Sequence, residues 1–482
     1  MRKGFTKNIL LIWQNAEIIL IILFFAIFSF NIRKVFLTPY SFLNGQFNEY
    51  LTPNLSLSDL LAFLAIFIIA IKHAYCQLYL RRLNYTLSGH NYRLLSINNL
   101  PYYFSRETFL ITAFFSWIAL SIFWSPFKQI AIYRTVLILG LFIYFLVVYF
   151  SAKKSLYLKK WLKMAILFSA AIQAIIAIFQ FVRNSSLGFT ALGESILGPG
   201  IPGVAKIAIY GVKHIRSYGT FGHPNILAGF LLIPMFLIVD KVTDYFVDDH
   251  RSKTNVSREN ISVGKRYVFT HITLFFVIFI AFILTFSREA YISFFIGLVI
   301  LFTVKFGSIF AISKARIISA FFILFAIAFL VVSRIYPSVF LSTQSLEERK
   351  IYLDISRETI SSHPLTGVGI GQFVFNEFVK HPTLQSWQYQ PVHNFLLLIT
   401  SELGIIGLAL FLLFILGLLW RRVRSTKSIG LTRLSYYCII IGFLFISMFD
   451  HYFWDLKQGL IIFFIPFVLF LIESDDLTYY DI

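Results

Sequence analysis

Residues 129–150 read QIAIYRTVLILGLFIYFLVVYF, and this run sets the class of the fold. Its length is close to the ~20 apolar residues that an α-helix needs to cross a bilayer. Runs of this kind recur along the chain, at about 9–31, 56–80, 107–125, 129–150, 161–182, 223–240, 267–286, 289–305, 315–336, 392–420, 431–449 and 456–473. We therefore predict an all-α polytopic membrane protein, a single transmembrane domain over residues 1–482, with about twelve membrane-spanning helices.

The composition agrees with a membrane protein. Of 482 residues, 58% are hydrophobic and only 13% are charged, and the mean hydropathy is +0.77. A soluble domain carries roughly a quarter charged residues, so this chain would expose far too much apolar surface to water. The two cysteines, Cys76 and Cys438, fall in apolar runs and indicate neither a disulfide framework nor a CxxC metal site.

The net charge of +19 follows a pattern along the chain. Arg2, Lys3 and Lys7 precede the first run, and most other Lys and Arg residues fall in alternate loops. The positive-inside rule then places both termini in the cytoplasm. The apolar helices themselves would be surrounded by membrane lipids. No soluble segment has a basic face with interleaved aromatic residues, which argues against nucleic acid as a partner.

Two predicted outer loops are long, at 183–222 and 337–391, and loops of this length are often functional. The second contains a predicted helix at about 345–361. Its apolar residues recur every seven positions and form one stripe: Leu346, Leu353 and Ile360. Arg349 lies on the same side. We expect this helix to lie against the outer membrane face.

Polar residues crowd four places, each at the predicted outer start of a helix that runs inward. They are Arg216–Asn225 (RSYGTFGHPN), Ser287–Glu289, Pro391–Asn394 and Asp450–His451. A helix start presents free backbone N–H groups and a partial positive charge. With Arg216, Arg288 and Arg349, these starts predict an outward-facing anion site. A diphosphate at the membrane surface is the natural ligand, because arginine binds phosphate oxygens bidentately.

One of these places carries a longer pattern. His393 and Asn394 are followed, after nine residues, by Gly404 and Gly407, which gives HN-x9-GxxG. Behind a long outer loop, this pattern resembles the signature of the O-antigen ligase and polymerase superfamily. Three further segments agree with the family: 216–225, 287–289 and 363–373. The resemblance covers about residues 130–460.

The resemblance implies a GT-C-like glycosyltransferase of the bacterial cytoplasmic (inner) membrane, with its site facing outward. Such an enzyme takes a glycan from undecaprenyl diphosphate and uses neither a metal nor another cofactor. Ligases pass the glycan to an acceptor glycolipid, a lipid A–core sugar, whereas polymerases extend a growing lipid-linked glycan. We expect the ligase reaction, with the polymerase reaction as the alternative and a protein O-oligosaccharyltransferase as a third relative.

Mapped onto this chain, the resemblance makes His393 the catalytic residue, either as general base or as the group that orients the acceptor hydroxyl. A neutral imidazole with an ordinary pKa, about 6.5, suits this role at neutral pH. Arg216 and Arg288 would clamp the diphosphate, with Arg349 as a third candidate. The supporting residues are Asn394, His223, Asn225, Gly404, Gly407, Asp450 and His451. We expect Asp450 and His451 to pair with each other.

Some of the same residues invite other interpretations. Gly367, Gly369 and Gly371 imitate a nucleotide-binding glycine loop only loosely, because no strand–helix unit accompanies them. A tight backbone bend after the helix at 345–361 is the better prediction. Glu402 lies in an apolar run, and we expect it to pack against or hydrogen-bond to a neighbouring helix.

A zinc site and a transporter are the rival functions. His363, His381, His393 and His451 have irregular spacings, and neither a Cys nor a Glu-x-x-His pattern supports zinc. A flippase or transporter of lipid-linked glycans would place paired charges or broken helices at mid-membrane, and often shows internal repeats. The polar residues here gather at the outer ends of helices instead.

Overall fold

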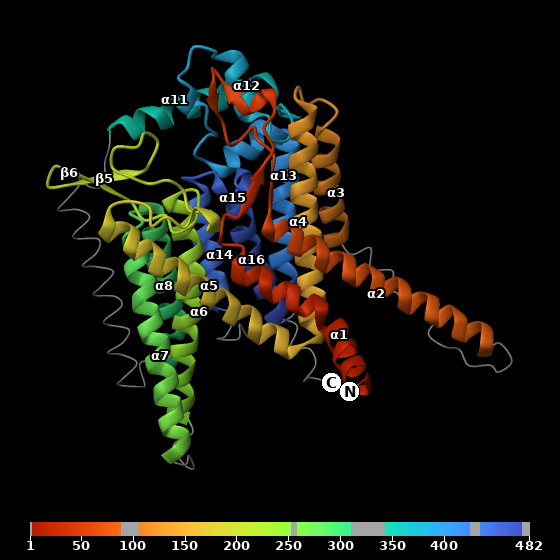
Figure 1. Cartoon of the computed structure of the whole chain (residues 1–482). Helices are drawn as coiled ribbons and strands as arrows, with labels where there is room; N and C mark the ends of the chain where they lie inside the picture. The colour runs from red at the N-terminus through yellow and green to blue at the C-terminus, as the bar shows by residue number, and fades with distance from the viewer. Residues whose placement is uncertain (1, 88–105, 252–257, 310–342, 425–433, 475–482) are drawn as a thin grey trace.

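The computed structural model describes residues 2–87, 106–251, 258–309, 343–424 and 434–474. This part of the chain is mostly helical, and its long helices form one bundle (Figure 1). They are α1 (Arg2–Ile27), α2 (Leu57–Leu87), α3 (Arg106–Ser121), α4 (Lys128–Lys154), α5 (Leu156–Arg183), α6 (Pro224–Arg251), α7 (Arg258–Ile283), α8 (Arg288–Ile309), α13 (Phe395–Arg424), α14 (Leu434–Ser447) and α16 (Lys457–Ser474).

Each predicted apolar run coincides with one of these helices, except 315–336, which lies outside the described residues. By length and composition, six stretches of the described helices could cross a membrane. They are Leu57–Tyr75, Lys128–Lys154, Leu156–Arg183, Pro224–Thr243, Arg266–Ile283 and Phe395–Leu419. The protein is therefore a polytopic helical membrane protein. The figure of about twelve spans and the GT-C-like arrangement stay predictions.

The described chain is mostly helical, as predicted, and it also contains short antiparallel strand pairs. These are β1 (Arg33–Val35) with β4 (Asn54–Ser56), β2 (Phe42–Leu43) with β3 (Gln46–Phe47), and β5 (Lys206–Ile209) with β6 (Val212–Ile215). Asn44 and Gly45 join β2 to β3 with φ angles of 48° and 79°. Two consecutive positive φ angles make the tight turn that matches the twist of a hairpin.

Helix α6 is the centre of the bundle. Of its most apolar stretch, 94% is buried within the protein, and α6 contacts α5, α7, α8, α14 and α16. A helix that is apolar all round is expected in such a central position. Because its neighbours fix α6, they also fix the polar residues at its start, His223 and Asn225.

The described part of the predicted loop at 337–391, from residue 343 onward, forms a cap over one end of the bundle (Figure 1). Within it lie α11 (Thr343–Ser362), α12 (Phe373–Lys380) and the 3-10 turn η4 (Ser386–Gln388). Helix α11 corresponds to the helix predicted at 345–361. The other predicted loop, 183–222, holds a 3-10 turn (η3, Thr190–Leu192) and the β5–β6 hairpin.

The buried face of α11 differs from the predicted stripe. Its fully buried residues are Tyr352, Ile355, Ser356 and Thr359. Leu353 and Ile360 are only half-buried, and the side chain of Leu346 lies outside the described part of the chain. The reason is that α11 packs on α13. Small polar side chains allow close approach there, and the hydroxyls of Ser356 and Ser401 lie 3.0 Å apart.

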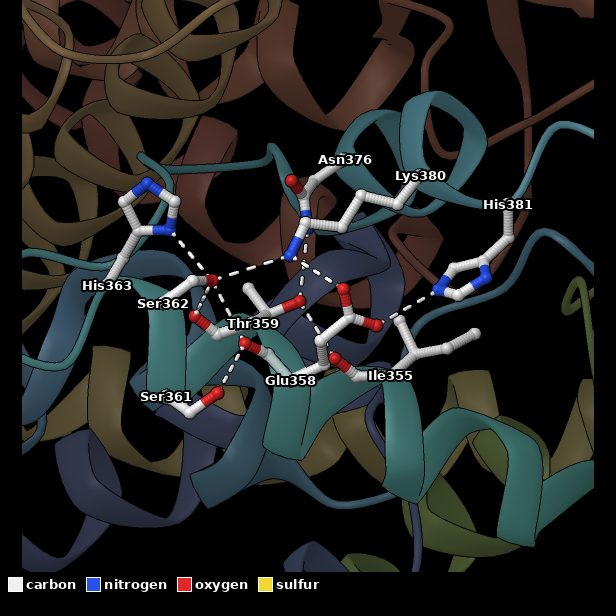
Figure 2. A network of polar contacts seen from close by, with 9 residues as sticks. All are labelled: Ile355, Glu358, Thr359, Ser361, Ser362, His363, Asn376, Lys380 and His381. Carbon is white, nitrogen blue, oxygen red and sulfur yellow. Dashed lines mark hydrogen bonds and ion pairs between the residues drawn. The ribbon is translucent and has the colours of Figure 1, made fainter.

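Polar side chains join the end of α11 to α12 (Figure 2). Lys380 Nζ lies 3.1 Å from one carboxylate oxygen of Glu358, and His381 Nε2 lies 3.2 Å from the other. The side-chain amide of Asn376 donates to Thr359 Oγ1 at 3.0 Å. These contacts hold the two helices of the cap together.

Helix α13 breaks at Gly404, where φ is 68° and ψ is −177°. Only glycine adopts this backbone region readily. The break leaves carbonyl groups that the helix itself no longer pairs. The carbonyls of Ser401 and Glu402 instead accept the N–H groups of Val368, at 3.0 Å, and Gly369, at 2.8 Å.

The segment after α11 therefore pairs with the broken helix. The predicted tight bend is confirmed, since Gly367, Gly369 and Gly371 all have positive φ. In the same pairing, the N–H of Ile405 donates to the carbonyl of Pro364 at 2.9 Å. An unpaired backbone group in a membrane costs several kcal/mol, which explains why the bend and the break occur together.

Replacing Gly404 with alanine tests this pairing. The added Cβ would lie 2.0 Å from the carbonyl oxygen of Leu365, so we expect a loss of about 2–5 kcal/mol in stability. The measurement is the apparent melting temperature of the purified protein in detergent. Gly417→Ala is the control in the same helix, because its nearest neighbour would be Leu110 Cδ1 at 3.5 Å. Equal melting temperatures for the two variants would contradict the pairing.

Candidate functional site

A cavity of about 660 Å³ lies where several helices begin. Residues predicted from the sequence that line it are Arg216, His223, Asn225, Arg288, Arg349, His393, Asp450 and His451. Arg216 follows β6, His223 and Asn225 lie at the start of α6, and Arg288 begins α8. His393 precedes α13, and Asp450 and His451 precede the short helix α15 (Tyr452–Asp455). The fold thus brings together residues that are far apart in the sequence.

Arg216 is the first member of a hydrogen-bonded chain. Its Nε donates to the carbonyl of Thr285 at 2.6 Å, and Nη2 donates to Asn225 Oδ1 at 2.5 Å. Asn225 Nδ2 donates in turn to Asp450 Oδ2 at 2.7 Å. Burial lowers the pKa of Arg216, and the carboxylate of Glu289 opposes that shift. These bonds orient the guanidinium on the cavity wall.

Arg288 and Arg349 are the two remaining arginines of the predicted anion site. Both line the cavity, both are half-buried, and neither makes a hydrogen bond or ion pair with any residue that the structure describes. The nearby carboxylate of Glu289 is engaged by the hydroxyl of Ser287 at 2.8 Å. Two cations beside Arg216 therefore face a polar space, which favours an anion with several oxygens.

His393 sits between two aromatic rings. Tyr352 stacks on it with a centroid distance of 5.5 Å, and His451 meets it edge-on at 4.8 Å. Among the described residues, nothing bonds to its Nδ1. Burial, with the nearby His451, lowers the pKa of His393 to about 3. The imidazole is therefore neutral at physiological pH, but it is a weak base.

The predicted side-chain pair between Asp450 and His451 does not form. His451 Nδ1 lies 2.9 Å from the carboxylate of Asp455, one helical turn away. Asp450 Oδ1 instead accepts the backbone N–H of His451 at 2.8 Å. Burial lowers the pKa of His451, but the carboxylate of Asp455 and that of Asp450 outweigh it, and the net shift is upward.

Asp450 is held as an anion by the same cluster. Burial raises its pKa, but the neighbouring His451 opposes this most strongly, and the net effect lowers the pKa to about 2. The pKa of His223 is lowered to about 3, first by burial and then by Arg216. The carboxylates balance part of the positive charge around the cavity.

Three residues of the HN-x9-GxxG pattern act on the backbone rather than in the cavity lining. Asn394 Oδ1 accepts the N–H of Leu397 at 2.9 Å, which caps the start of α13. Gly404 allows the break in α13. At Gly407 a Cβ would lie 3.2 Å from the ring of Trp117, so glycine permits close packing there.

The prediction for Glu402 is confirmed. Its carboxylate accepts the indole N–H of Trp454 at 2.8 Å, which links α13 to α15. Neither residue is part of the cavity lining.

The segment between α1 and α2 also contributes to the cavity, and the sequence pattern did not predict this. Arg33, Glu49 and Tyr50 from this segment line the cavity, and Arg33 pairs with Glu49. The ring of Tyr50 lies 5.8 Å from that of His451. Asn48 anchors the segment by donating to the carbonyl of Tyr389 at 3.0 Å. The Asn44–Gly45 dipeptide was the one sequence signal, and it predicts only a turn.

Arg134 was also missed, although it lies within the run 129–150. Its Nη1 and Nη2 donate to the carbonyls of Asp455 and Trp454, both at 2.6 Å. A lone arginine inside an apolar run is a signal for such a role, because an unpaired charge in a membrane is costly. Here the cation satisfies carbonyl groups at the end of α15.

No group of three or more His, Cys, Asp or Glu side chains within the described residues is arranged to hold a metal ion. Lys206 and Lys457 add positive charge to the cavity lining, and Lys457 pairs with Asp59. The cavity is therefore a cationic, polar space whose lining includes histidines.

Comparison with known families agrees with this arrangement. Residues 273–412 match a family model described as O-antigen ligase. The matched range includes Arg288, Arg349 and His393, whereas Arg216 and His451 fall outside it. A search of curated proteins found no match.

The resemblance predicted from HN-x9-GxxG is confirmed over this part of the chain, and the match supports the O-antigen ligase superfamily. This family implies glycosyltransferase-like activity on lipid-linked glycan and polysaccharide substrates. Together with the apolar helices, it indicates a bacterial membrane protein.

The two histidines should titrate differently. Because the pKa of His393 is about 3, we expect its ring to stay neutral over about pH 5–8. The pKa of His451 is raised, so the midpoint of its titration should lie above the ordinary histidine value of about 6.5. NMR of histidine-labelled protein in detergent measures both, with signals assigned from His393→Gln and His451→Gln spectra. Protonation of His393 within that range would contradict the described environment.

Proposed function

We propose that this protein is a glycosyltransferase of the O-antigen ligase type. It would move a glycan from undecaprenyl diphosphate to an acceptor hydroxyl at the outer face of the cytoplasmic membrane. The proposal rests on one observation: the same cavity is lined by His393 and by three arginines, Arg216, Arg288 and Arg349. The family match over residues 273–412 supports the reaction class.

The charge of the cavity fits a diphosphate. Arg288 and Arg349 make no bond with the described residues, and each guanidinium can bind two phosphate oxygens. The starts of α6 and α8 add backbone N–H groups with a partial positive charge. The volume, about 660 Å³, falls within the ~300–1,000 Å³ typical of ligand pockets.

The same groups suit the reaction. When the glycan leaves its carrier, negative charge builds up on the diphosphate, and fixed arginines stabilise that charge in the transition state. Arg216 is already oriented by Thr285 and Asn225, so little reorganisation is needed. The acceptor hydroxyl approaches from the side of His393, which is neutral and can accept a hydrogen bond from it.

The location of the polar residues also supports a transferase over a transporter. They gather at the starts of helices, next to the cap formed by α11 and α12. By the positive-inside rule this end of the bundle faces outward, towards the periplasm. A lipid-linked donor can reach such a site from the outer leaflet.

His393→Ala tests the catalytic role. In a deletion strain of a Gram-negative host, we expect this variant to restore about 10²-fold less glycan transfer than the unchanged protein, because the acceptor hydroxyl is no longer positioned for attack. Transfer is measured as labelled glycan on the acceptor per amount of membrane-inserted protein. His363→Ala is the control, since His363 is exposed in the same loop and is not part of the cavity lining. Equal transfer by both variants would refute the role of His393.

The deletion strain also separates the two reactions of the superfamily. Loss of a ligase leaves long glycan on the lipid carrier. Loss of a polymerase leaves single repeats on the acceptor. We expect the first outcome, and the second would replace the ligase reaction with the polymerase reaction at the same site.

Arg288→Gln tests diphosphate binding independently of turnover. Loss of one charge-assisted interaction, about 1.5–3 kcal/mol, should weaken binding about 10- to 100-fold. The probe is undecaprenyl diphosphate in detergent, measured by native mass spectrometry. Arg357→Gln is the control, because Arg357 is exposed on α11 and pairs with Asp354 at 3.1 Å. Unchanged binding by Arg288→Gln would remove Arg288 from the diphosphate site.

A further inference from the structure

We infer that His451, paired with Asp455, is the general base of the transfer, and that His393 orients the acceptor hydroxyl beside it. The inference rests on the proposed function and assigns the proton to a different histidine from the one that the sequence pattern marks. It follows from the contacts of the two rings.

His451 has the geometry of an oriented base. Its Nδ1 lies 2.9 Å from the carboxylate of Asp455. A carboxylate accepts hydrogen bonds, so Nδ1 carries the proton and Nε2 keeps a lone pair. Nε2 makes no hydrogen bond with the described residues, and the side chain lines the cavity. This is the arrangement in which a third group fixes the tautomer of a catalytic imidazole.

The partner carboxylate is itself held in place. Asp455 ends α15, and Arg134 donates to the backbone carbonyl of Asp455 and to that of the preceding residue, Trp454, at 2.6 Å. At the other end of the turn, Asp450 accepts the backbone N–H of His451. The backbone that carries the dyad is therefore fixed at both ends.

His393 lacks such support. Its Nδ1 has no hydrogen-bond partner among the described residues, so nothing there selects its tautomer. Its neighbours are the ring of Tyr352 and the ring of His451. With a pKa of about 3, it would hold a proton poorly. Its location beside His451 suits it to guide a hydroxyl towards Nε2.

The charges around His451 come from several elements. Asp455 and Asp450 are on its own segment, and both raise its pKa. Arg349 on α11 acts in the opposite direction. The rings of His393 and Tyr50 contact it from the start of α13 and from the segment between α1 and α2. The two carboxylates prevail, so the imidazolium formed during the reaction is stabilised.

The step balances as a displacement at the anomeric carbon. The acceptor oxygen forms the new glycosidic C–O bond with that carbon. The bond between the carbon and the diphosphate oxygen breaks, and the electron pair leaves with the diphosphate at the arginines. The hydroxyl proton moves to Nε2 of His451, and Asp455 stabilises the resulting cation.

The pH dependence of transfer distinguishes the two histidines. We would measure kcat/KM of the purified protein in detergent, with donor and acceptor extracted from the deletion strain. The rate should rise with pH as the base loses its proton, with a midpoint above about 6.5. Asp455→Asn removes a carboxylate that raises the pKa of His451, so the midpoint should move to lower pH while the maximal rate falls. Asp354→Asn, on the exposed side of α11, should change neither.

His451→Gln should reduce maximal transfer about 10²–10⁴-fold while undecaprenyl diphosphate still binds, which shows that the variant is folded. His393→Ala should lower the maximal rate but leave the midpoint unchanged. Full transfer by His451→Gln, or an unmoved midpoint in Asp455→Asn, overturns the inference. If His393→Ala abolishes transfer and His451→Gln does not, the proposed function survives and only the inference fails. Full transfer by both variants overturns the two together.

Discussion

Inside a bilayer, every backbone N–H or C=O group that leaves a helical ladder must find another partner within the protein. The candidate site of this protein lies next to a place where that constraint acts. Helix α13 breaks at Gly404, and the glycine-rich bend after α11 supplies the missing hydrogen bonds. This pairing ties the cap to α13, and the same helix begins with Asn394 and His393. The position of His393 therefore depends on backbone hydrogen bonds made about three turns further along the helix.

The charged side chains around the cavity differ in whether the protein supplies a partner for them. Arg216 is fixed through Asn225 to Asp450, whereas Arg288 and Arg349 have no partner among the described residues. A ligand that brings its own negative charge would complete the set. The histidines in the cavity lining differ in their support, since His451 has a carboxylate partner and the Nδ1 of His393 has no partner among the described residues. His393 and His451, whose ring centroids lie 4.8 Å apart, thus have different chemical properties.

The sequence predicted those features that depend on composition and on local pattern. Apolar runs located the helices, and the polar residues at helix starts pointed to Arg216, Arg288 and His393, which the fold brings to one cavity. The sequence could not reveal contacts between distant segments. Tyr50 reaches His451 only because Asn48 bonds to the carbonyl of Tyr389, and nothing in the local pattern around Tyr50 indicates this.

The buried face of α11 was missed for a related reason. A repeat of leucine and isoleucine predicted which side faces away from water, but packing on α13 placed Ser356 and Thr359 inside. Hydrophobic periodicity assumes that the buried neighbour is apolar, and a close helix–helix contact favours small side chains instead. Arg134 shows the converse case, since a charge within an apolar run binds carbonyl groups that only the folded chain brings near it.

The anchoring of the segment between α1 and α2 has a consequence for biogenesis. Its residues line the cavity together with residues beyond position 450, and Asn48 is held by a carbonyl 341 positions further along the chain. During synthesis, the first helices enter the membrane long before their partners leave the ribosome. The early segment therefore lacks its final contacts until the later helices have been synthesised. The site closes only when the last helices have been inserted, so an unfinished chain carries no complete cavity in the membrane.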